Sequence, residues 1–192
     1  YREAAEAELI GDPFACFQYA QAYKGRFEAG EESIASERTS ALNYFYLHGN
    51  RFPGKYRRKA ENVLATDITT AAFYAKMNGG RFPGDYPEAQ KRAELVIAGK
   101  PAAALDYAEN NGGRFPDDHE GVREKAEGEI AKSLPEHTYA YAEMNGGRFP
   151  GDYPEIQRRA EYNIAQSLYY ALQYAALNGG RFPSDHPDVQ RY

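Results

Sequence analysis

One eleven-residue segment occurs twice in this chain without a single change: NGGRFPGDYPE begins at Asn78 and again at Asn145. Its Arg-Phe core occurs at four further places, so the chain contains six versions of the loop. A loop that serves one catalytic site needs no duplicates, whereas a loop that closes one unit of a repeated structure must occur in every unit. The repetition therefore predicts a repeat architecture.

The repeated positions extend well beyond the loop. Aligned on the loop arginine, successive units are 25, 30, 33, 34 and 33 residues apart, which is the range of helical repeats. The aligned arginines are Arg26, Arg51, Arg81, Arg114, Arg148 and Arg181. A tyrosine stands seven residues before each of them: Tyr19, Tyr44, Tyr74, Tyr107, Tyr141 and Tyr174. A glutamate follows in the first five units, three residues before an Ile or Leu: Glu31, Glu61, Glu94, Glu127 and Glu161.

The part of each unit before the loop is predicted to be a helix, which we call the first-type helix. It is rich in alanine with apolar residues at helical spacing, as in TTAAFYAKM from Thr69. Asp12 before Pro13, and Ser133 with Glu136, are typical of the start of such a helix. Asn-Gly-Gly then provides the left-handed backbone at which helices commonly end.

The part after the loop is predicted to be a second-type helix. Asp85 with Glu88, and Asp152 with Glu155, form the pattern of a capping box, with proline in the first turn. The repeated glutamate lies further along this helix. The length differences between units fall between the loop and this glutamate.

Two short helices cannot bury a core alone, but stacked pairs can. We therefore predict an all-α fold, an α-solenoid of about six stacked helix-loop-helix repeats that forms a single domain over residues 1–192. The last unit is incomplete. The predicted units are residues 11–36, 37–66, 67–99, 100–132, 133–166 and 167–192.

The repeated side chains are interpreted as structural anchors. The tyrosines are predicted to lie in the core, and each loop arginine is predicted to bond the glutamate of its own unit or the carbonyl groups of a helix end. For Arg148 the expected carboxylate is Glu161.

Residues 12–36, DPFACFQYAQAYKGRFEAGEESIAS, resemble a tandem repeat of the GRFPEGE type found in uncharacterised proteins of tailed phages and some bacteria. Glu28 stands where that repeat has proline. The resemblance implies helical repeats and a phage origin, and it carries over no activity. The matching residues are Tyr19, Gly25, Arg26, Phe27, Gly30, Glu31, Ile34 and Ala35.

The sequence offers little support for catalysis. It contains no nucleophile-and-base pattern, no phosphate-binding glycine loop and no zinc-protease motif, and its one cysteine, Cys16, falls at an apolar helical position. We therefore expect a non-enzymatic protein without catalytic residues, metal or cofactor. No apolar run approaches the ~20 residues of a membrane span. The expected location is the cytoplasm, that of the host if the protein is phage-encoded, with the virion as the alternative.

Two features point to partners. Tyrosines outside the repeated positions, namely Tyr46, Tyr139, Tyr162, Tyr169 and Tyr170, are typical of protein interfaces, so a protein partner is expected. The incomplete last repeat suggests self-association. The alternative is a nucleic-acid contact at the one basic cluster, although a net charge of −5 disfavours it. That cluster consists of Lys55, Arg57, Arg58 and Lys59.

Overall fold

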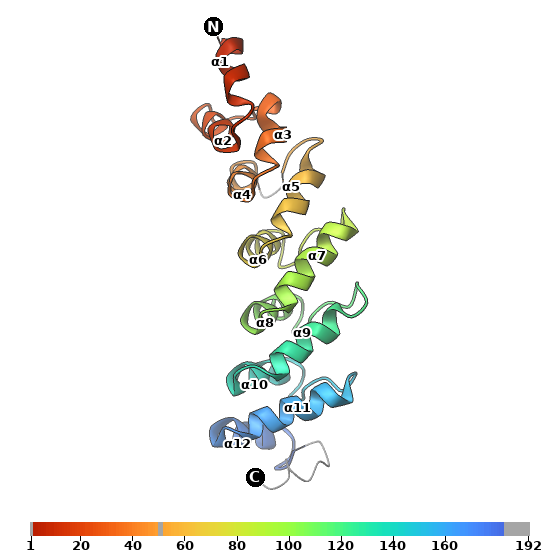
Figure 1. Ribbon diagram of the computed structural model, residues 1–192. Helices are drawn as coiled ribbons and strands as arrows, with labels where there is room; N and C mark the ends of the chain where they lie inside the picture. The colour runs from red at the N-terminus through yellow and green to blue at the C-terminus, as the bar shows by residue number, and fades with distance from the viewer. Residues whose placement is uncertain (1, 50–51, 183–192) are drawn as a thin grey trace. The chain divides into compact units, whose positions relative to one another are not determined.

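A computed structural model of the chain describes residues 2–49 and 52–182, and every regular element in these residues is helical (Figure 1). The all-α prediction is thereby confirmed for this part of the chain. The chain divides into two compact units, Tyr1–Val96 and Ile97–Tyr192, which we describe separately. The solenoid and the single domain stay predictions.

The first unit contains two rows of helices. Its elements are α1 (Arg2–Leu9), α2 (Pro13–Ala22), the 3-10 turn η1 (Glu28–Gly30), α3 (Glu31–Ile34), α4 (Arg38–Leu47), α5 (Arg57–Leu64), α6 (Ile68–Met77) and the greater part of α7 (Pro87–Ala98). α2, α4 and α6 pack side by side in chain order, while α3 and α5 each contact the first-type helices before and after them (Figure 1).

The second unit has the same plan. Its helices are α8 (Pro101–Glu109), α9 (Val122–Ala131), α10 (Pro135–Met144), α11 (Pro154–Ala165) and α12 (Leu168–Leu177). The first-type helices α8, α10 and α12 contact one another in order, and the second-type helices α9 and α11 contact each other and the first-type helices beside them. The helix pairs expected from the sequence are therefore present in the described residues.

The helix starts agree with the sequence only in part. Asp12 caps α2 as predicted, because its Oδ1 accepts from the amides of Phe14 and Ala15 at 2.9 and 3.1 Å. The prediction for Ser133 is wrong: α10 starts one residue later, after Leu134, and the Ser133 hydroxyl donates to the carbonyl of Ile130.

The prediction of a capping box at Asp152 is also wrong. The residue that precedes α11 is Tyr153, and no side chain caps this helix. Asp152 instead forms ion pairs with Arg114 and Arg123 of the preceding repeat. Asp85 is likewise paired with Arg57 of the preceding repeat. A nearby guanidinium offers a carboxylate a stronger hydrogen bond than a backbone amide does.

The glycines of the loop end the first-type helices, as predicted. Gly146 and Gly147 have φ angles of 79° and 89°. At Gly113, whose φ is 91°, a Cβ would also lie 2.9 Å from the carbonyl oxygen of Met144 in the next repeat. The second glycine of the loop thus permits both the left-handed turn and the close approach of two repeats.

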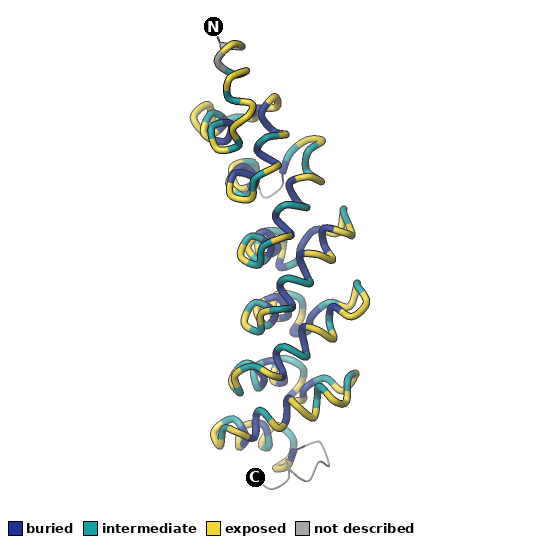
Figure 2. The backbone as a smooth tube through the Cα atoms, in the orientation of Figure 1, coloured by how far each residue is buried: buried dark blue, intermediate teal, exposed yellow. Residues whose placement is uncertain are grey.

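The core is built from the repeated aromatics and from alanines, and Figure 2 shows it as the buried inner faces of the helices. Five of the repeated tyrosines are buried, and Tyr19 is half-buried. Each of the six tyrosine rings lies against the phenylalanine that follows the loop arginine, with centroids 4.8 to 5.3 Å apart. Tilted pairs at such distances are favourable beyond the area they bury. Cys16 lies in the core as well.

The helix α1 lies before the first predicted unit and was not predicted from the sequence. Its Glu6 stands three residues before Leu9, which is the spacing of the repeated glutamates, and α1 packs on α2. The hydroxyl of Tyr19 donates to Glu6 Oε1, thirteen residues away. α1 therefore occupies the position of a second-type helix before the first predicted unit.

In the last repeat, Leu168, Leu172 and Leu177 of α12 are exposed. The remainder of the incomplete repeat, VQRY included, lies outside the described residues. Among the helices that are described, none combines the length and the apolarity needed to cross a membrane.

Candidate functional site

The repeated tyrosines bond the glutamate of the preceding repeat. Tyr141 Oη donates to Glu127 Oε1 at 3.0 Å and accepts from the amide of Phe115 at 3.2 Å. The same hydroxyl-to-glutamate bond joins Tyr44 to Glu31 at 3.0 Å, Tyr74 to Glu61 at 2.8 Å, and Tyr174 to Glu161 at 3.2 Å. These bonds are buried, so each one joins neighbouring repeats in a region that water does not enter.

The arginine-to-glutamate ties predicted within each unit are seen in some repeats. Arg26 bonds both oxygens of Glu31, at 2.8 and 3.0 Å. Arg114 Nε donates to Glu127 at 3.2 Å. In the third repeat the nitrogen-to-oxygen distance between Arg81 and Glu94 is 3.8 Å, which makes an ion pair.

The remaining loop arginines differ. Arg148 is exposed and its Nε donates to Asn178 Oδ1 at 3.0 Å, so its hydrogen bond goes to the next repeat instead of to Glu161. Arg181 is exposed. Arg51 lies outside the described residues, and Glu61 of its repeat is bonded at 2.8 Å by Arg57.

The electrostatics of these contacts follow from burial. Desolvation raises the pKa of Glu127, and the hydrogen bond from Tyr141 and the attraction of Arg114 offset it only in part. Burial, together with the adjacent glutamate, raises the pKa of Tyr141 and of its counterparts Tyr44 and Tyr174 well above the usual range. The hydrogen bond with Glu31 raises the pKa of Arg26. Burial thus shifts the ionisation of Glu127 and of these three tyrosines in the same direction, toward the protonated form.

The described residues contain no group of three or more His, Cys, Asp or Glu side chains placed to hold a metal ion. The repeated glutamates, which are the most deeply buried carboxylates, are engaged with tyrosines and arginines of the repeats. These side chains therefore form hydrogen bonds within the fold.

The basic cluster is partly neutralised by its own chain. Arg57 bonds Glu61 and also pairs with Asp85, and its side chain is only 18% exposed. Burial alone would lower the pKa of Arg57, but the bond with Glu61 leaves it raised. Lys59 lies 3.6 Å from Glu32 and donates to its carbonyl oxygen. Lys55 and Arg58 are exposed.

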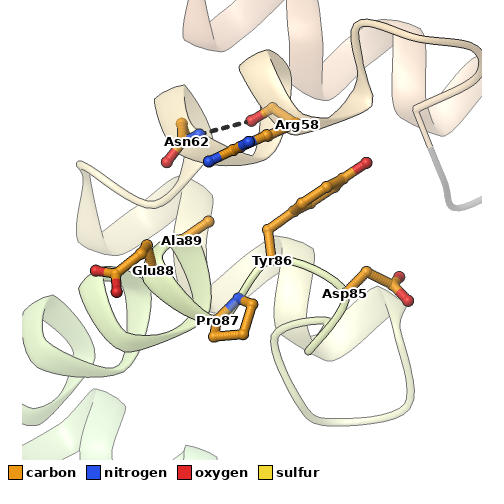
Figure 3. A pocket seen from close by; sticks show the side chains of 7 residues that line it. All are labelled: Arg58, Asn62, Asp85, Tyr86, Pro87, Glu88 and Ala89. Carbon is orange, nitrogen blue, oxygen red and sulfur yellow. Dashed lines mark hydrogen bonds between the residues drawn. The ribbon is translucent and has the colours of Figure 1, made fainter.

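A cavity of about 260 Å³ lies beside Arg58, between α5 and the start of α7. Figure 3 shows Arg58 next to the ring of Tyr86, with Asp85 and Glu88 on opposite sides of Pro87. Two carboxylates beside one guanidinium make this a mixed electrostatic environment. Such a cavity does not favour the phosphates of a nucleic acid.

A second surface gathers aromatic and aliphatic side chains on α10 and α12. The rings of Tyr139 and Tyr170 lie 5.4 Å apart, and those of Tyr170 and Tyr169 lie 5.1 Å apart in an edge-to-face arrangement. Leu168, Tyr169 and Leu172 are 73, 66 and 61% exposed. We call these five residues the aromatic patch. Exposed apolar groups that lie together, with tyrosines among them, are typical of binding surfaces.

Two further tyrosines outside the repeated positions, Tyr46 on α4 and Tyr162 on α11, are exposed as well. That these tyrosines contact a partner stays a prediction.

The loop asparagines are anchors that the sequence analysis missed. Asn145 Nδ2 donates to the carbonyl of Gly113 at 2.8 Å, and Asn178 Nδ2 donates to that of Gly147 at 2.7 Å. Each of these bonds links a loop to the preceding loop. Asparagine recurs before Gly-Gly in several loops, and this recurrence could have indicated a contact between loops. It was interpreted only as part of the signal that ends the helix.

Comparison of the chain with models of protein families, with curated proteins and with solved structures found no match. The function is therefore inferred from the contacts and exposure of the chain's own residues.

Proposed function

We propose that the chain is a non-enzymatic helical-repeat scaffold, an α-solenoid of about six stacked units, that binds another protein through the aromatic patch. The recurrence of one tyrosine-to-glutamate contact between successive repeats supports the repeat architecture. Nearest-neighbour contacts of this kind are how helical repeats stabilise one another.

The observation that carries the binding proposal is the cluster of aromatic rings formed by Tyr139, Tyr170 and Tyr169. Tyr139 and Tyr170 are half-buried, whereas Tyr169 is exposed together with Leu168 and Leu172 of the same helix. Tyrosine supplies a large contact area with few rotatable bonds, which keeps the entropy cost of binding low. The repeated polar anchors are used inside the fold, so partner recognition depends on residues that differ between repeats.

The test is capture of partner proteins by the immobilised full chain, with quantification by mass spectrometry. The patch variant is Tyr169→Ser with Leu172→Ser, and the matched control is Tyr46→Ser with Phe73→Ser, two exposed residues of the first unit. A bound protein should be retained by the control and reduced about tenfold or more by the patch variant. Equal capture by both variants would contradict the proposal, as would no capture at all.

The nucleic-acid alternative rests on the exposed Lys55 and Arg58 alone. Phosphate contacts weaken steeply with salt, so they are strongest at low ionic strength. Absence of a mobility shift with DNA or RNA at ~50 mM salt would exclude this alternative.

A further inference from the structure

A groove of about 460 Å³ lies at the N-terminal ends of α8 and α10 in the second unit. Pro101 and Ala102 of α8 contribute apolar atoms to it, as does Leu134, which is 55% exposed. Lys100 and Lys132 line the same groove. It therefore combines an apolar surface with two cationic side chains.

The same position in the first unit holds carboxylates. Asp12, Glu37 and Asp67 each stand seven residues before a repeated tyrosine, and each accepts hydrogen bonds from backbone amides of the helix that follows. Before α8 and α10 the corresponding residues are Lys100 and Leu134, and neither helix has a side-chain cap. The groove thus lies at the position where α2, α4 and α6 have a carboxylate, whereas α12 has Ser167 there and, like α8 and α10, no side-chain cap.

The polar groups of the groove are incompletely paired. Lys100 forms no ion pair with any residue that the structure describes. Among the residues that the structure describes, Lys132 pairs only with Glu129, at 3.1 Å on the exposed surface. The Nδ1 atom of His137, which also lines the groove, is buried without a hydrogen-bond partner within the described part of the chain. A carboxylate supplied from outside would complement the two lysines, because an ammonium group forms charge-assisted hydrogen bonds with a carboxylate.

We propose that this groove binds an acidic peptide segment of the partner protein, with a carboxylate between Lys100 and Lys132 and an adjoining aliphatic side chain against Leu134 and Pro101. The proposal rests on the protein-binding function above and names the chemistry of the partner. A free inorganic anion would leave the apolar surface uncovered. A nucleic acid has no aliphatic side chain to place there.

Binding is tested by fluorescence anisotropy of the full chain with a labelled peptide, Gly-Glu-Leu-Asp-Leu-Gly. Two control peptides separate the contributions: Gly-Gln-Leu-Asn-Leu-Gly lacks the charge, and Gly-Glu-Ser-Asp-Ser-Gly lacks the aliphatic groups. Both controls should bind about tenfold more weakly or worse. Because the chain has a net charge of −5, attraction of an acidic peptide has to come from a local site.

The variants Lys100→Glu and Leu134→Ser should each weaken binding of the acidic peptide by about tenfold. The control is Lys76→Glu, a charge reversal at an exposed residue of α6, which should leave peptide binding unchanged. Lys100 and Leu134 are exposed, so both variants are expected to fold, which circular dichroism checks. The proposal is overturned if the acidic peptide does not bind at about 1 mM, if phosphate displaces it completely, or if the two variants bind it unchanged.

Failure here is distinguishable from failure of the proposed function. The variant Tyr169→Ser with Leu172→Ser should still bind the peptide, since neither residue lines the groove. Peptide binding without protein capture would count against the aromatic patch alone. Capture that is insensitive to Lys100→Glu would count against the groove alone.

Discussion

Tyr141 and Glu127 belong to neighbouring repeats, and the hydroxyl of the first donates to the carboxylate of the second at 3.0 Å. The same hydroxyl accepts from the amide of Phe115, and all three groups are buried. One phenol oxygen thus satisfies a charged acceptor and a backbone donor of the preceding repeat.

Tyr141→Phe should lower the free energy of unfolding by about 1–3 kcal/mol, because both partners of the hydroxyl stay buried without it. Urea denaturation of the full chain measures the change. Tyr46→Phe is the control, since this ring is 64% exposed and its loss of a hydroxyl should have no effect. Equal stability of the two variants would show that the buried network contributes nothing.

Alkaline pH should unfold the protein through its buried tyrosines. The pKa values of Tyr44, Tyr141 and Tyr174 are raised, chiefly by burial, whereas an unfolded tyrosine ionises near pH 10. Their contribution to stability is therefore fully present below about pH 10 and is lost as the pH rises toward the folded pKa values.

The measurement is a titration to alkaline pH in which tyrosinate absorbance and the circular dichroism of the helices are recorded together. The loss of stability is expected at about pH 10 and above. The buried tyrosines should ionise only as helicity is lost. Ionisation of all 17 tyrosines with the helices intact would contradict the expectation.

Arg114→Ala should destabilise the chain more than Arg148→Ala. Arg114 pairs with the fully buried Glu127 and with Asp152, whereas Arg148 is exposed and bonds Asn178. Because the Arg114 side chain is 34% exposed, solvent screening limits the expected cost to about 2 kcal/mol. For Arg148→Ala we expect less than about 1 kcal/mol. Thermal and urea denaturation of both variants would reveal a reversed order.

Gly113→Ala should be more harmful than Gly112→Ala. Both residues have positive φ angles, 91° and 84°, so either alanine costs about 1–2 kcal/mol of backbone strain. Only at Gly113 does the added Cβ meet a neighbour, the carbonyl oxygen of Met144 at 2.9 Å; at Gly112 nothing lies within 4 Å. The melting temperatures of the two variants are compared. A smaller decrease for Gly113→Ala than for Gly112→Ala would show that Gly113 does not lie close to the carbonyl group of Met144.

The sequence predicted those features that depend on local geometry. The spacing of Tyr141, Gly147 and Phe149 was enough to place a helix, its end and the ring that packs against it. Position within a repeat does not say which neighbour a side chain faces. The carboxylate of Asp152 was therefore assigned to its own helix, although Arg114 and Arg123 of the preceding repeat are its partners.

The candidate site was less predictable. Aromatic residues in excess of the repeat were recognised, but the contact between Tyr139 and Tyr170 depends on how α10 packs on α12. The sequence suggested that the basic cluster was free to contact phosphates. The structure shows that Arg57 of this cluster forms ion pairs with Glu61 and Asp85. A long charged side chain can reach several partners, and the tertiary packing determines which of them it contacts.

The bond between Tyr19 and Glu6 spans thirteen residues, as do those of Tyr44, Tyr74 and Tyr174 with their glutamates. These four junctions within the two units thus have the same donor and acceptor at the same spacing, so one repeat can follow another without a change of contact. Excision of residues 115–148 would join Arg114 to Phe149 and bring Glu161, already bonded to Tyr174, onto the arginine of the earlier loop. A gene of this kind can gain or lose a whole repeat by recombination without having to evolve a new contact.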